Sequence, residues 1–241
     1  MRLGKKMSDA AQAQSKVITT DSLCRYFGAG DTQVKALDQV SMSISKGEFT
    51  AIIGPSGSGK TTLLHLIGGL DNPTQGSVFL SGTNIANMSG SDLSDFRRDH
   101  IGFIFQSYNL IPVLSAEENI EYIMLLQGTD ANTRKQRVNE MLYQVGLEGL
   151  GNRRPAELSG GQQQRVAIAR AMASKPDIIL ADEPTANLDS KTGIALLDLM
   201  KKLNEEQNMT FVFSTHDTKI MDRARRLIHI EDGKVILDED K

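Results

Sequence analysis

A glycine-rich break between two apolar runs constrains the fold of this chain more than any other feature. Residues 48–70 read EFTAIIGPSGSGKTTLLHLIGGL, in which one apolar run ends at Ile53 and a second follows Lys60. The first run is typical of a buried strand and the second of a helix. Glycine adopts backbone conformations that other residues rarely reach, so several main-chain N–H groups can face one concavity. The stretch therefore predicts a strand, an anion-binding loop and a helix.

The break also fits the pattern G-x-x-x-x-G-K-[S/T], which binds the phosphates of a nucleoside triphosphate. Lys60 supplies a cation for the β- and γ-phosphates, Thr61 supplies an oxygen for Mg²⁺, and the helix N-terminus adds positive potential. The alternative is a glycine-rich turn without a ligand, but the strand before it and the helix after it favour a nucleotide site. The predicted contacts are Gly54, Pro55, Ser56, Gly57, Ser58, Gly59, Lys60, Thr61 and Thr62.

A second candidate is the acidic end of the apolar segment PDIILADEP, residues 176–184. A buried strand here delivers Asp182 to the carboxyl edge of the sheet, where ligands of such sheets bind. Asp182 can hold the Mg²⁺ shell, and Glu183 can polarise the water that attacks the γ-phosphate. The alternative is a pair of solvated acids that cap a loop. The phosphate-binding loop upstream favours the catalytic interpretation.

A second glycine-rich run, LSGGQ, begins at Leu158. Ser159 is a good N-cap, so the run predicts the start of a helix. Two glycines inside a helix cost about 1 kcal/mol each relative to alanine, and capping alone does not offset that cost. Gly160 and Gly161 leave bare amides at the positive end of the helix, which predicts a second anion site.

The order of segments predicts an α/β core with a helical insert. Short β-prone pieces flank GAGD at residues 28–31, as antiparallel strands do. Strand–helix units then surround a region of helical periodicity in which Ser115 and Glu118 form a capping box. The predicted fold class is α/β, a mixed sheet core with an antiparallel β subdomain and an inserted α-helical subdomain. Together with the G-x-x-x-x-G-K-[S/T] pattern at residues 54–61, this arrangement resembles a P-loop NTPase (RecA-like) core. The predicted boundaries are a disordered tail at 1–16, a core with its β subdomain at 17–106 and 159–241, and a helical subdomain at 107–158.

Composition excludes several functional classes. The net charge of −3 over 241 residues does not indicate a nucleic-acid-binding surface. Cys24 is the only cysteine, so no internal disulfide can form and a reducing compartment is expected. No apolar run approaches the roughly 18–20 residues that span a bilayer, and the N-terminus lacks the apolar part of a secretory signal.

From Val17 onward the chain resembles the ATP-binding cassette (ABC) ATPases. The glycine-rich break resembles the Walker A motif, LSGGQ the signature motif and IILADE the Walker B motif. Three shorter stretches resemble the Q-loop, the D-loop and the switch histidine of that family. They are FIFQ at 103–106, NLD at 187–189 and His216 in STHD.

The resemblance implies an ATPase with ATP and Mg²⁺ as cofactors. Tyr26 would stack on adenine; the alternatives are core packing and the adjacent Phe27. The catalytic residues implied are Glu183 and His216, and the metal ligands are Thr61, Gln106 and Asp182. Besides the Walker A residues, the implied nucleotide contacts are Tyr26, Gln106, Ser159, Gly160, Gly161, Gln162 and Asp189.

Paired cassettes of this family also imply a partner. Two copies would associate head-to-tail, with each ATP between Lys60 of one copy and Ser159 and Gly161 of the other. Such a two-fold interface is self-complementary. Hydrolysis would then release the two copies, so that the ATP state controls open and closed populations.

Longer stretches, among them RRDHIGFIFQSYNLIPVLSAEEN, resemble the MacB/LolD-like branch. This branch implies a separate integral membrane permease with a large extracytoplasmic domain, and a place at the cytoplasmic face of the membrane for the cassette. Residues 106–119 would form the coupling surface, with packing inside the helical subdomain as the alternative for Tyr108, Leu110, Ile111 and Leu114. Ala186 stands where a glycine is common, and an ordinary backbone angle is expected there.

Two other functions share these motifs. ABC ATPases of DNA maintenance usually split the cassette around a long coiled coil, and no sustained heptads occur in this sequence. Assembly or division factors of the family cannot be separated from transport subunits by sequence.

Overall fold

The computed structural model describes residues 15–241, without the side chain of Asp31. Almost all of the predicted tail, residues 1–16, lies outside the described residues. The first strand begins at Lys16.

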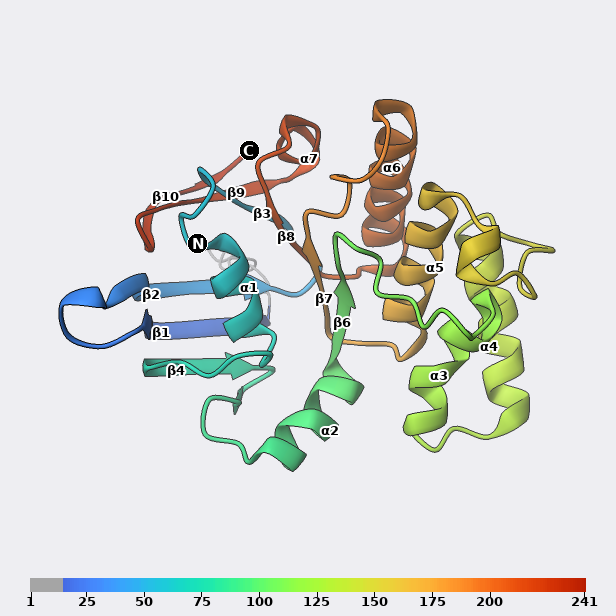
Figure 1. The fold of residues 1–241 in the computed structure, drawn as a ribbon, viewed down its shortest axis with the longest axis horizontal. Coiled ribbons are helices and arrows are strands. Elements are labelled where there is room, and N and C mark those ends of the chain that lie inside the picture. The colour runs from blue at the N-terminus through green and yellow to red at the C-terminus, as the bar shows by residue number, and fades with distance from the viewer. Residues whose placement is uncertain (1–14) are drawn as a thin grey trace, which may run out of the picture.

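Two sheets form the framework (Figure 1). The smaller sheet is antiparallel, as predicted, in the order β2-β1-β4-β5. It comprises β1 (Lys16–Phe27), β2 (Val34–Ser45), β4 (Gln75–Leu80) and β5 (Thr83–Asn84). The central sheet has the order β10-β9-β3-β8-β7-β6, in which only β10 is antiparallel to its neighbour. It comprises β3 (Phe49–Ile53), β6 (Ile101–Ile104), β7 (Ile178–Asp182), β8 (Phe211–Thr215), β9 (Arg226–Glu231) and β10 (Lys234–Asp240).

The helices follow the predicted order. They are α1 (Lys60–Ile67), α2 (Gly90–His100), α3 (Ala116–Leu126), α4 (Ala131–Gln144), α5 (Gly160–Ala173), α6 (Ser190–Gln207) and α7 (Thr218–Arg223), with 3-10 turns η1 (Gly30–Thr32) and η2 (Pro155–Glu157). In Figure 1 the antiparallel sheet lies on the left, and α3 and α4 lie on the right, beyond α5. Both bonds of the capping box at Ser115 are present. Among residues 15–241, no helix has the length and apolar character that crossing a membrane requires.

The central strands are buried on both faces, which explains their continuous apolar sequences. Phe211 and Phe213 of β8 belong to one core cluster and Val212 to the other. Successive strand residues point to opposite faces, so one strand supplies both clusters. Residues of α5 and α6 pack on one face, and residues of α1 and the antiparallel sheet pack on the other.

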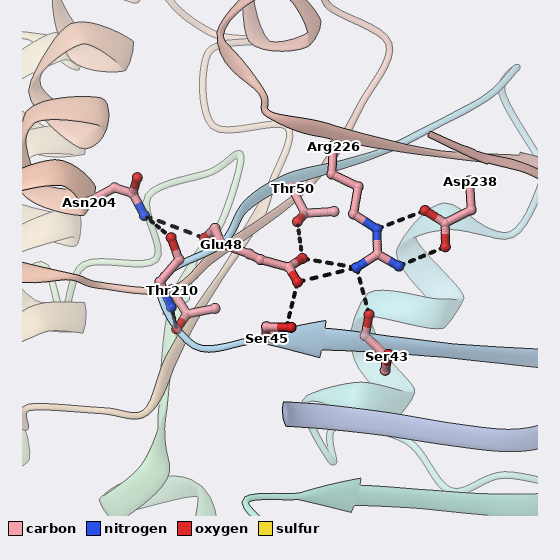
Figure 2. Close-up of polar contacts among 9 residues, drawn as sticks. Ser43, Ser45, Glu48, Thr50, Asn204, Thr210, Arg226 and Asp238 are labelled. Carbon is pink, nitrogen blue, oxygen red and sulfur yellow. Dashed lines mark hydrogen bonds and ion pairs between the residues drawn. The ribbon is translucent and has the colours of Figure 1, made fainter. Parts of the chain in front are cut away.

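A polar network fastens the opposite edge, where the parallel strands begin (Figure 2). The Arg226 guanidinium binds Asp238 through two bonds of 2.7 Å and Glu48 through bonds of 3.0 and 3.3 Å. These acids, with Asp238 contributing most, raise the pKa of Arg226 above its ordinary value. The Glu48 carboxylate also accepts bonds from Ser45 and Thr50. The network joins β2, β3, β9 and β10 at the edge opposite the phosphate-binding loop.

Candidate nucleotide site

The phosphate-binding loop connects β3 to α1 as the sequence predicts. Gly59 has φ 105° and precedes the first helical residue, Lys60. A Cβ atom at Gly59 would collide with the main-chain carbonyl of Ala36, and one at Gly54 with that of Ile230. Only glycine fits at these two positions, because backbone rather than a movable side chain occupies the space. The loop is therefore shaped by β2 and β9 as well as by its own sequence.

Lys60 is held inside this loop. Its side-chain nitrogen donates to the carbonyl oxygens of Gly54 at 2.9 Å and Pro55 at 2.7 Å, and the residue is only 7% exposed. A buried ammonium group with only carbonyl partners in this region retains an unbalanced positive charge. A phosphate anion would supply the missing countercharge.

Thr61 and Asp182, two of the predicted metal ligands, are in contact. The Thr61 hydroxyl donates to a carboxylate oxygen of Asp182 at 3.1 Å, although the two residues lie on α1 and β7. Hydroxyl and carboxylate oxygens are hard ligands that suit Mg²⁺, which binds proteins through few groups and keeps several waters. The residues present therefore fit a magnesium ion bound to a triphosphate.

Glu183 lies between two polar residues of the β8 end. One carboxylate oxygen is 2.6 Å from Nδ1 of His216, and the other accepts a 3.1 Å bond from the Thr215 hydroxyl. The backbone of Glu183 is left-handed, with φ 44°, and its N–H donates to the carbonyl of Ser214. A non-glycine residue in this region is strained by about 1–3 kcal/mol and is typical of functional sites. The predicted catalytic pair is thus in direct contact.

These residues surround a cavity of about 670 Å³. It is lined by Val34, Lys35, Ala36, Ser56, Gly57, Gly59, Lys60, Thr61, Thr62, Gln106, Glu183, Ala186, His216, Asp232 and Gly233. The structure therefore brings together most of the predicted Walker A residues, Gln106 and the catalytic pair. Ala186 has no positive φ, as expected. Asp232 and Gly233 of the hairpin between β9 and β10 also line the cavity. No motif in the sequence assigns these two residues to the site.

Tyr26 is not among the residues that line this cavity, although Lys35, its partner on β2, is one of them. The Tyr26 hydroxyl donates to Asp38 at 2.9 Å, and Asp38 borders a smaller hollow that shares Lys35 and Asp232 with the cavity. Hydrogen bonding to Cys24 and Asp38 raises the pKa of Tyr26. The adenine contact of Tyr26 stays a prediction.

Phe27 is the alternative aromatic residue at this end of the cavity. It is 44% exposed and pairs across the strands with Val34, which lines the cavity. Directly opposed residues of an antiparallel pair project to the same face. The Arg25 guanidinium lies 4.5 Å from the Phe27 ring centroid and is itself held by two bonds to Asp71.

The signature segment starts α5 and does not line the cavity of its own chain. Ser159 accepts a bond from the N–H of Gln162, whose side chain accepts from the N–H of Ser159. Ser159 is exposed and Gly161 is buried, where an added Cβ would collide with the Thr192 methyl group. Close packing on α6 is thus a second reason for glycine at 161, besides the bare amide that the sequence predicts.

The predicted D-loop, residues 187–189, contacts both α6 and Gln106. Asp189 caps α6 by accepting from the N–H groups of Lys191 and Thr192. Hydrogen bonding from the Thr192 side chain, then from its main chain, lowers the pKa of Asp189. The Asn187 amide donates to the Gln106 carbonyl at 2.9 Å. Neither Asp189 nor residues 159–162 are among the residues that line the cavity.

Comparisons with known proteins agree with this geometry. A family model described as ABC transporter matches residues 37–186. An uncharacterized ABC transporter ATP-binding protein of Thermotoga maritima is 47% identical over 220 residues, which cover 91% of this chain and 94% of that protein. The macrolide export ATP-binding/permease protein MacB of Hyphomonas neptunium is 45% identical over 92% of this chain, and the match spans 34% of MacB.

A solved structure is similar over the same range. The dimeric post-hydrolysis state of the ATP-binding cassette MJ0796, bound to ADP and Pi, has a TM-score of 0.85 and 44% identity. The match covers 92% of this chain and 98% of that one. MJ0796 is from Methanocaldococcus jannaschii. The predicted P-loop NTPase fold is confirmed by this likeness.

Proposed function

This chain belongs to the ABC transporter family as an ATP-binding subunit, and on that premise we propose that it powers a membrane transport or mechanotransmission complex of the MacB/LolD-like type. The observation that carries the proposal is the contact of Glu183 with His216 beside a loop that holds Lys60. Members of the family bind and hydrolyse ATP. The residue-by-residue roles given below are our assignment.

In the proposed reaction, Lys60 and the glycine-rich amides bind the β- and γ-phosphates. Thr61 and Asp182 would hold Mg²⁺, which supplies countercharge for the phosphates when it is bound. The Glu183 carboxylate orients and polarises the attacking water, and His216 orients Glu183 while its ring reaches toward the γ-phosphate. Water, rather than a protein group, attacks the phosphorus, so the chain's task is positioning and electrostatics.

The complete site in this proposal needs a second copy of the chain. Ser159 is exposed at the start of α5 and is not among the residues that line the cavity at Lys60. The MJ0796 structures are dimeric, which supports the same arrangement here. ATP would then be bound between the phosphate-binding loop of one copy and Ser159 of the other.

The proposed membrane partner is an integral permease with a large extracytoplasmic domain, and it would hold this subunit at the cytoplasmic face of the membrane. The name of MacB describes an ATP-binding part and a permease in one protein. This chain matches about a third of the length of MacB. Residues 110–114 are the proposed contact. Val113 is 71% exposed, whereas Leu110 packs partly against the main core cluster.

Affinity purification of the tagged chain from detergent-solubilised membranes tests the proposed function. We expect one integral membrane protein with a large extracytoplasmic domain to co-purify, and MgATP to be hydrolysed by the complex. Substitution of Val113 by aspartate should reduce recovery of the partner without reducing ATP binding by the chain alone. Recovery of soluble partners only would instead favour an assembly or DNA-maintenance ATPase.

Phe27 is the proposed adenine contact, and matched leucine substitutions can distinguish it from Tyr26. Stacking of a base on an aromatic ring contributes about 1–3 kcal/mol. Phe27→Leu should therefore weaken ATP binding by about fivefold or more, while Tyr26→Leu should have a smaller effect. Isothermal titration calorimetry of each variant measures this difference. A larger loss for Tyr26→Leu would return the assignment to Tyr26.

A further inference from the structure

A sharp turn follows Gln106 and carries two consecutive left-handed residues. Tyr108 has φ 61° and Asn109 has φ 48°. Neither is glycine, so each conformation costs about 1–3 kcal/mol and persists only where neighbouring groups hold it. The turn lies between the predicted nucleotide contact at Gln106 and the proposed partner contact at residues 110–114.

The side chain of Arg170, on α5, binds the main chain of this turn. One guanidinium nitrogen donates to the carbonyl of Tyr108 at 3.0 Å and another to the carbonyl of Asn109 at 2.5 Å. In the part of the chain that the structure describes, Arg170 forms no ion pair, and burial lowers its pKa. Arg170 is half-buried, and a partly desolvated cation without a carboxylate partner adds little to stability. The two carbonyl bonds are the specific interactions that this arginine makes with the turn.

Other contacts join the same turn to the first residues of α5. A Cβ atom on Gly160 would lie 2.8 Å from the Tyr108 hydroxyl, which is also 3.5 Å from the carbonyl of Asn187. The Gln164 amide donates to the carbonyls of Pro184 at 2.7 Å and Phe105 at 3.5 Å. The turn is thus in contact with the start of α5 through Tyr108 and with its later part through Arg170.

We propose that Arg170 is a positioning residue that joins the turn after Gln106 to α5, so that Gln106 and the exposed Ser159 surface move as one body. Displacement of residues 110–114 by a membrane partner is then transmitted through two hydrogen bonds to the surface that binds the second copy's ATP. This inference rests on the proposed ATP-driven dimer. Arg170 contacts neither phosphate nor water in this scheme.

The test uses the Glu183→Gln chain, in which the ATP-bound dimer should accumulate, and adds Arg170→Met. Methionine keeps an apolar side chain of similar length and removes the partly buried charge, so the variant is expected to fold. The ATP concentration that gives half-maximal dimer should rise about tenfold or more, measured by analytical ultracentrifugation with MgATP. ATP affinity of the monomer should change less than about twofold, because Lys60 and its loop are untouched. Arg170→Lys should recover part of the dimer, because an ammonium group can still donate to these carbonyls.

Arg165→Met is the matched control. Arg165 lies on the same helix and also donates to a main-chain carbonyl, that of Val145 at 2.8 Å, but it binds the end of α4 instead of the turn. Removal of this bond should leave ATP-driven dimerisation unchanged. An equal loss in both variants would show a general weakening of α5 and would overturn the proposal.

Two results separate the inference from the function on which it rests. If the Glu183→Gln parent dimerises and Arg170→Met dimerises at the same ATP concentration, the role of Arg170 is wrong and the proposed function stands. If the parent does not dimerise with ATP, the proposed function fails. Amide hydrogen exchange then decides the inference, because Arg170→Met must accelerate exchange at residues 107–110 and at residues 160–162 together. Acceleration at the turn alone, or at neither segment, would overturn it.

Discussion

Glu183→Gln is expected to reduce ATP turnover by about 10²–10⁴-fold, which is the range for removal of a positioned acid–base group. Glutamine keeps the shape of the side chain, and its amide can still lie near His216 and Thr215. It lacks the negative charge that polarises the attacking water. ATP binding should persist, because Lys60, Thr61 and Asp182 are unchanged.

The same variant should accumulate as an ATP-bound dimer. Without hydrolysis, the γ-phosphate that joins the two copies is not removed, so association is no longer reversed by the reaction. Phosphate-release assays and size-exclusion chromatography with MgATP measure the two effects. Glu148→Gln is a suitable control, because Glu148 is an exposed glutamate at the end of the helical subdomain. Normal turnover in Glu183→Gln would remove Glu183 from its assigned role.

Lys60→Ala should have the second large effect, a loss of nucleotide binding itself. Truncation of one partner of a buried charge pair costs about 2–5 kcal/mol, which corresponds to an affinity loss of at least about 30-fold. The ammonium group is already in place without nucleotide, since it bonds to the carbonyls of Gly54 and Pro55. The cost therefore reflects lost interaction with phosphate and not the ordering of a flexible lysine.

Calorimetric titration with ATP, and separately with ADP, measures this loss. We expect a greater loss for ATP than for ADP, because Lys60 is assigned to both the β- and γ-phosphates. Lys202→Ala removes an exposed lysine of α6 and should leave both affinities unchanged. Equal ATP affinity in Lys60→Ala and the unchanged chain would contradict the phosphate-binding assignment.

Most of the strands and helices could be predicted, because local sequence patterns and the burial seen in the structure indicate the same elements. Serines at positions 115 and 159 start helices in the sequence pattern and in the structure. The apolar runs of β3, β7 and β8 are buried strands, and Asp182 and Glu183 stand at the carboxyl end of β7. Each of these predictions depends on residues close together in the chain, where sequence periodicity is most informative.

The sequence could not decide between Tyr26 and Phe27 as the adenine contact, for a physical reason. A shift of one residue along a strand moves a side chain to the other face of the sheet. The pairing of β1 with β2 shifts register between Leu23 and Arg25, and again between Arg25 and Tyr26. Two adjacent aromatic residues follow these irregularities, so alternation along the strand could not decide which of them faces the cavity.

The contacts of Arg170 could not be predicted for a different reason. They join residues far apart in the sequence, and the acceptors are main-chain carbonyls, which every residue carries. No side-chain pattern distinguishes Tyr108 and Asn109 as left-handed. Arg170 itself lies in a segment whose sequence pattern is typical of an ordinary core helix.

The position of β3 in the central sheet has a consequence for synthesis of the chain. β3 pairs with β8 and β9, so both neighbours of the strand that precedes the phosphate-binding loop belong to the last part of the sequence. Pairings between segments that lie far apart in the sequence form late. During translation, a strand can pair only after its partner strand has left the ribosome. A nascent chain that has emerged only through α6 holds the complete Walker A sequence but neither of those strands, and it should have no capacity to retain ATP until the final stage of translation.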